Sequence, residues 1–169
     1  MINPKSSSTN FLAWSLLIIL SIIWGSSFIL MKKGLVAFDP GEIAALRIFS
    51  ASLFLFPIAI QNLRQIKTRR QWAFLFASGF LGSLIPAFLF PLAQTRIDSA
   101  ITGVLNALTP FFTIMIGGIL VGAKFNNRIK LGIFIGFLGS IILVTAGSGY
   151  NFTQINYYAL FIVLATILY

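Results

Sequence analysis

The residues of this sequence that could do chemistry are polar side chains inside long apolar runs. Arg47 lies in one such run, and Asn106, Thr109 and Pro110 lie in another. A charged or amide group at membrane depth is costly unless it meets a protein partner or a water-filled passage. The chemistry that these residues could provide is therefore the binding of a polar solute rather than the breaking of a bond.

The run that holds Asn106 has a regular polar pattern. Thr102, Asn106 and Pro110 recur every four residues, so a continuous helix would carry them on one face as a polar stripe. Pro110 has no N–H group and leaves the carbonyl of Asn106 without its intrahelical donor. The stripe could line a cavity, or Asn106 could bond a neighbouring helix across a kink.

Arg47 also has two interpretations. An arginine at the centre of a span costs about 3 kcal/mol on insertion scales. The side chain could snorkel outward and pair with an acid, for which Asp98 is a better candidate than Glu42, because Glu42 lies five residues away and the favourable helical spacings are three and four. Alternatively, Arg47 attracts an anionic group of a substrate near the outer mouth of a cavity.

The first apolar run contains a large ring, a glycine and two hydroxyl groups in succession, at Trp24 to Ser27. We assign the ring and the two hydroxyl groups to the cavity that the polar stripe could line. The predicted substrate cavity is lined by Trp24, Ser26, Ser27, Arg47, Asn106, Thr109 and Pro110.

Most enzyme classes are excluded by what the sequence lacks. It contains no cysteine and no histidine, which removes Ser-His-Asp and Cys-His nucleophiles and thiolate or imidazole metal sites. It has no phosphate-binding loop motif and no paired carboxylates within a span. We expect no catalytic residue, no metal and no cofactor. Nucleic acid is not expected either, because the net charge of +9 comes from basic residues in short loops between apolar runs.

The elements that must position these residues are membrane-spanning helices. Hydrophobic residues make up 58% of the chain and charged residues only 9%, against about 25% charged in a soluble domain. An all-α, polytopic membrane helix bundle is predicted, with five crossings and the start of a sixth. The expected helices run over Leu12–Met31, Pro40 to about Ile60, Trp72–Ala93, Ser99 to about Gly122, and Leu131–Ala146, followed by a short piece over Tyr157–Tyr169.

The loops predict the orientation. Eight basic residues fall on one side of the predicted bundle and three on the other, with Arg47 inside a span. Because basic loops are retained in the cytoplasm, the N-terminus should be cytoplasmic.

Several stretches together resemble a known family. They are Ile22 to Phe28 with its Trp24-Gly25 pair, Ala44 to Ala51 around Arg47, Thr102 to Phe112, and the glycine-rich Gly132 to Gly147. In this order and spacing they resemble the EamA-type transporters of the drug/metabolite transporter superfamily.

This resemblance implies ten helices built as two five-helix inverted repeats around a central cavity. Residues 1–147 would be the first repeat, and residues 148–169 a loop and the truncated start of the second. The match of Thr166–Tyr169 to Ser21–Trp24 as small, apolar, apolar and aromatic supports this expectation, and we expect the sequence to be incomplete at its C-terminus.

The function expected from the residues and the resemblance is secondary transport. The chain would export small metabolites or amino-acid-like compounds by alternating access across the bacterial cytoplasmic (inner) membrane. Its partners would be a small-molecule substrate, the lipid bilayer, and either a second five-helix repeat or another copy in a homodimer. The alternative is a non-transporting five-span bundle that acts as a partner or dimerising subunit.

Overall fold

The protein is described by a computed structural model that covers residues 5–120, 122, 126–147 and 157–169. Within these ranges every regular element is a helix, so the predicted all-α membrane bundle is confirmed. The elements are α1 (Lys5–Gly34), α2 (Pro40–Leu63), α3 (Arg69–Gly79), η1 (Phe80–Leu84), α4 (Ile85–Gln94), α5 (Ser99–Asn106), α6 (Thr109–Leu120), α7 (Asn127–Gly147) and α8 (Tyr158–Leu168).

Four helical segments are long and apolar enough to cross a membrane, judged by length and composition. They are Phe11–Gly34, Pro40–Leu63, Arg69–Gln94 and Ser99–Ile119, which match the first four predicted crossings. The fifth predicted crossing lies within α7, but several side chains of its last two turns are outside the described residues, so this crossing stays a prediction. The short sixth piece forms α8, whereas most of the loop before it, residues 148–156, is also outside the described part.

Local sequence signals explain where the helices begin and break. Asp39 is extended and its N–H donates to Glu42 Oε2 at 2.9 Å, which starts α2 at Pro40 as the sequence predicts. The third span contains a five-residue π-helix, η1, which ends two residues before Pro86. The Ile85 N–H reaches back five residues to the carbonyl of Phe80. The third span is therefore distorted by a π-bulge before Pro86.

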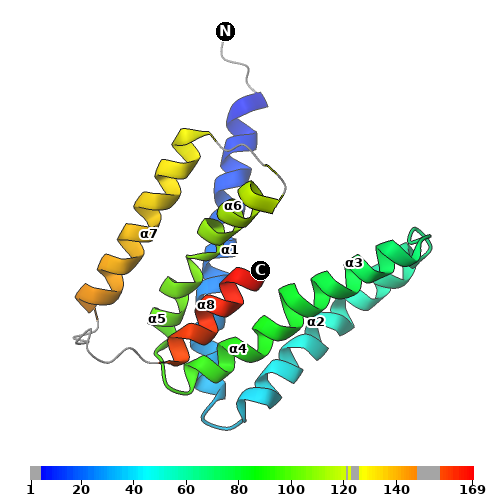
Figure 1. The fold of residues 1–169 in the computed structure, drawn as a ribbon, viewed down its shortest axis with the longest axis horizontal. Coiled ribbons are helices and arrows are strands. Elements are labelled where there is room, and N and C mark those ends of the chain that lie inside the picture. Colours follow the sequence, from blue (N-terminus) through cyan, green and yellow to red (C-terminus); the bar gives the residue numbers. More distant parts are fainter. Residues whose placement is uncertain (1–4, 121, 123–125, 148–156) are drawn as a thin grey trace.

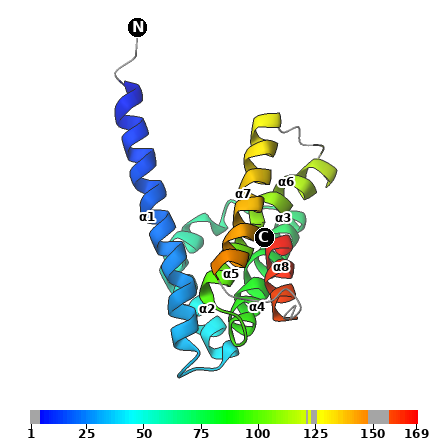
Figure 2. The same cartoon turned by 90° about the vertical axis from the view of Figure 1, so that its left-hand side faces the viewer.

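The helices converge at one end of the bundle (Figures 1 and 2). There, α8 packs against α4, α5 and α6, and α1 packs against α4 and α5. The N-terminal half of α1 extends beyond the other helices in Figure 2, and α2 and α3 extend away from the rest in Figure 1. The buried core is a small apolar cluster contributed by α1, α2, α4, the α4–α5 turn and α8: Met31, Ile43, Phe90, Ala93, Ile97, Ile162 and Ala165.

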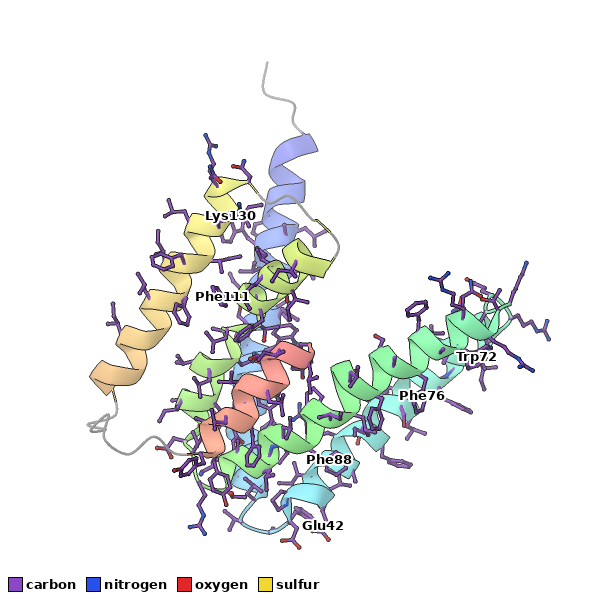
Figure 3. The ribbon with its side chains drawn as sticks, viewed as in Figure 1. Glu42, Trp72, Phe76, Phe88, Phe111 and Lys130 are labelled. Carbon is purple, nitrogen blue, oxygen red and sulfur yellow. The ribbon has the colours of Figure 1, made fainter. Side chains whose placement is uncertain are left out.

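Most of the apolar surface lies outside this core. No more than 11% of the apolar window of any of the four candidate spans is buried within the bundle, so lipid or further protein must cover the remainder. In Figure 3, Lys130 lies near the end of the molecule at which α1 begins, and Glu42 lies at the opposite end.

Candidate functional site

The fourth span is broken near its middle. Helix α5 ends at Asn106 and α6 begins at Thr109. Between them, the N–H of Ala107 donates to the carbonyls of Gly103 and Val104, and that of Leu108 donates to the carbonyl of Leu105 at 3.1 Å. The bonds that reach back only three residues tighten the chain into a short turn at Ala107 and Leu108, which separates the two helices.

The break alters the predicted polar stripe. Thr102 is fully buried and its hydroxyl donates to the Asp98 carbonyl at 3.0 Å, Asn106 is half-buried, and Pro110 is exposed in the next helix. A stripe on one continuous helical face is therefore wrong. Residues four positions apart lie on one face only if the helix between them is continuous. Here the helix is interrupted before Pro110, so the three residues do not share a face.

The carbonyl of Asn106, which receives no hydrogen bond from Pro110, accepts one from a side chain instead. The hydroxyl of Thr109 donates to the carbonyl of Asn106 at 2.8 Å, and it also lies 3.5 Å from Asn106 Oδ1. The sequence correctly predicts the loss of the amide donor, but not that the next side chain would replace it. Asn106 and Thr109 thus form one local polar unit at the break, which we call the Asn106–Thr109 pair.

The replacement of Thr109 by valine should test this pair. Valine keeps the branched shape and removes the hydroxyl, so the Asn106 carbonyl loses its donor and the free energy of unfolding should fall by about 1 kcal/mol. Chemical unfolding in detergent measures it. Thr109→Ser keeps the hydroxyl and should retain the wild-type value. Thr113→Val is the matched control, because the Thr113 hydroxyl donates to a carbonyl inside regular helix α6. Equal stability of Thr109→Val and Thr113→Val would refute the role of this bond.

Arg47 is directed toward α1. Its Nη1 lies 3.7 Å from the sulfur of Met31, which is only 4% exposed. Among the described residues, Arg47 makes no ion pair with Asp98, so the expected pairing with that acid is not observed. Tyr169, which follows α8, lies in the neighbourhood of Arg47. A thioether is a weak acceptor, so most of the donor capacity of the guanidinium remains available for another partner.

The three candidates on α1 differ in their surroundings. Trp24 is 61% exposed, and the exposed Ser26 hydroxyl donates to the carbonyl of Ile23 at 3.0 Å. Ser27 is half-buried and lies one helical turn before Met31, the residue that Arg47 contacts. Ser27 thus belongs to the same face of α1 as the Arg47 contact.

The seven predicted cavity residues therefore form two groups and a remainder. The Asn106–Thr109 pair is one group, and Arg47 with the Ser27 face of α1 is the other. Trp24, Ser26 and Pro110 are exposed on the described surface. Their assignment to a shared substrate cavity stays a prediction. In the part of the chain that the structure describes, no three acidic side chains cluster as a metal site would require.

Two polar residues that the sequence analysis did not select are also prominent. The Lys32 ammonium donates to the carbonyls of Gln94 at 2.6 Å and Ile97 at 3.0 Å. The Gln94 side chain is fully buried. The sequence shows that Lys32 lies in the last turn of one helix and Gln94 at the end of another. It does not show that they meet, because they are more than 60 residues apart in the chain.

Comparison with known proteins places this arrangement in a family. The model of the EamA-like transporter family matches residues 12–145, which is most of the chain. The chain belongs to the EamA-like transporter family. The resemblance seen in the sequence is thereby confirmed, and the broken fourth span and Arg47 both lie inside the EamA-like region.

One curated relative is a WAT1-related protein of Arabidopsis thaliana. It is 23% identical over 141 residues, which cover 76% of this chain and 39% of the relative. The chain therefore spans about two fifths of the length of that relative. No solved structure matches the chain.

Proposed function

We propose that this EamA-like chain forms the first five-helix repeat, residues 1–147, of a secondary transporter. In this proposal it exports small metabolites or amino-acid-like compounds by alternating access across a bacterial cytoplasmic membrane, together with a second inverted repeat. The observation that supports the proposal best is the break of the fourth span at the Asn106–Thr109 pair.

The location of this break suits solute binding. Asn106 and Thr109 lie near the middle of the span Ser99–Ile119. Interrupted helices are tolerated at that depth where the freed backbone groups meet protein or a polar cavity, and transporters use such interruptions for substrate binding. The half-buried amide of Asn106 supplies donors and an acceptor at the same place.

The proposal is tested by removing the amide of Asn106. A strain expressing the complete gene is loaded with a panel of labelled amino acids and small organic acids, and their efflux is measured. Asn106→Leu should reduce the efflux of any exported compound by about tenfold, since a lost hydrogen bond to a desolvated solute costs about 1.4 kcal/mol or more. The control is Asn62→Leu, because Asn62 is exposed and bonds only within its own end of α2 and the following turn. Efflux that is unchanged in Asn106→Leu would refute the assignment of this site.

The orientation can be tested because the sequence has no cysteine. Gln65 and Thr95 are both exposed and lie in turns at opposite ends of the third span. Given the excess of basic residues around Gln65, an impermeant maleimide added to intact cells should label Thr95→Cys and spare Gln65→Cys. Permeabilised cells should show labelling of both. Labelling of both in intact cells would mean that the chain inserts in two orientations, and it would favour the alternative of a dimerising subunit paired with an inverted copy.

A further inference from the structure

The end of α1 is tied to the turn between α4 and α5 by one lysine. Lys32 is half-buried, and its ammonium donates to the carbonyls of Gln94, the last residue of α4, and Ile97, in the turn itself. The last carbonyls of a helix have no intrahelical donor, and a cation there is favoured by the helix dipole. Lys32 therefore closes the bundle at the end that carries Asp39 and Asp98.

The residue whose backbone carbonyl Lys32 holds also carries a side-chain amide with no partner among the described residues. Gln94 is 0% exposed, and among the described residues neither its Oε1 nor its Nε2 makes a hydrogen bond. Buried amides are almost always bonded, and leaving one unpaired is costly. An apolar side chain would pack there without this cost, so the amide indicates a partner that the described residues do not supply.

The chemistry of the two residues indicates which partner fits. Once separated from the two carbonyls, Lys32 would carry an ammonium with three donors. Gln94, whose backbone carbonyl accepts from Lys32 in this structure, adds the two N–H donors of its side-chain amide. A carboxylate accepts from both groups and replaces neutral carbonyls on the ammonium with a charged acceptor, which makes a stronger bond.

We propose that this corner is a sealed binding site for a small carboxylate. The carboxylate displaces the Gln94 and Ile97 carbonyls from Lys32, the end of α1 separates from the α4–α5 turn, and the Gln94 amide donates to the bound anion. This deepens the transport function proposed above, on which it rests, because the carboxylate would be the solute carried.

Cysteine accessibility tests the seal without a known substrate. Gln94→Cys is introduced into the cysteine-free chain in membranes and treated with two small thiol reagents of similar size: 2-sulfonatoethyl methanethiosulfonate, which is anionic, and 2-(trimethylammonium)ethyl methanethiosulfonate, which is cationic. With Lys32 present, labelling should be slow, and the anionic reagent should react about threefold or more faster. With Lys32→Met added, both reagents should react about tenfold to a hundredfold faster, because two charge-assisted bonds are lost, and the preference for the anion should disappear.

Matched variants separate this proposal from general loosening. Lys33→Met removes an exposed lysine one residue away and should leave labelling slow. Lys32→Arg keeps the cation and should also remain slow. Thr95→Cys, exposed beside the site, should label quickly in every background. Slow labelling of Gln94→Cys in Lys32→Met, or fast labelling with Lys32 intact, would overturn the seal. A missing preference for the anionic reagent would overturn the carboxylate assignment.

A variant that does not fold is recognised separately. If Lys32→Met loses its helical circular dichroism, two other measurements still decide the proposal. They are the ratio of the labelling rates of the two reagents with Lys32 intact, and the labelling rate in Lys32→Arg. Failure of the transport proposal is also distinguishable, since it would appear as no efflux from the wild-type protein while the labelling pattern persists.

Discussion

The replacement of Phe90 by alanine is expected to lower the free energy of unfolding by about 2–3 kcal/mol. Phe90 is 3% exposed, and its ring centroid lies 5.7 Å from that of Phe28 and 6.2 Å from that of Tyr169. It therefore joins α4 to α1 and to the end of α8. Lipid is as apolar as the core, so the loss comes mainly from the cavity and the missing dispersion contacts rather than from transfer to water.

Unfolding in mixed micelles would measure this loss. Phe88→Ala is the matched control, because Phe88 is on the same helix but 43% exposed, and its truncation should change stability by no more than about 0.5 kcal/mol. An equal loss in both variants would show that the core is not centred on Phe90.

The replacement of Arg47 by leucine should affect insertion and transport in opposite directions. The removal of a charge from α2 should favour membrane insertion by up to about 3 kcal/mol. Transport should nevertheless fall by about tenfold or more, because the guanidinium near Met31, whose other donors are unused, would no longer be available to an anionic group of the substrate. Insertion is measured by the yield of membrane-integrated protein, and transport by the efflux assay described above.

Two further variants define the role of Arg47. Arg47→Lys keeps the charge but not the planar donor array and should retain only part of the transport rate. Arg64→Leu removes an arginine from the end of α2, beside the basic loop, and should leave transport unchanged. Wild-type transport in Arg47→Leu would show that this arginine has only a structural role.

Membrane crossings could be predicted from the sequence because their signal is local. A run of about 20 apolar residues must be helical in lipid, since no water is available for its backbone groups. The start of α2 was also local: Asp39, Pro40 and Glu42 lie within four residues and act on the same helix end. These are the features that the structure reproduces most closely.

The candidate site was less predictable because its contacts depend on tertiary packing. The sequence shows that Pro110 removes a donor, but whether Thr109 turns its hydroxyl to the freed carbonyl depends on the geometry of the turn at Ala107 and Leu108. Arg47 had no acid at a favourable helical spacing, and its contact with Met31 depends on how closely the end of α1 approaches α2 in the fold. Lys32 bonds carbonyls 62 and 65 residues away, which no local pattern could indicate.

The π-helix in the third span also affects how relatives should be aligned. Helix α3, before η1, contributes no buried residue, whereas α4, after it, buries Pro86, Phe90, Pro91, Ala93 and Gln94. A π-bulge adds one residue and rotates everything after it by about 100° relative to a regular helix. In relatives whose third helix is regular throughout, the equivalents of Phe90 and Gln94 should therefore be found only when a one-residue gap is placed within Phe80–Leu84.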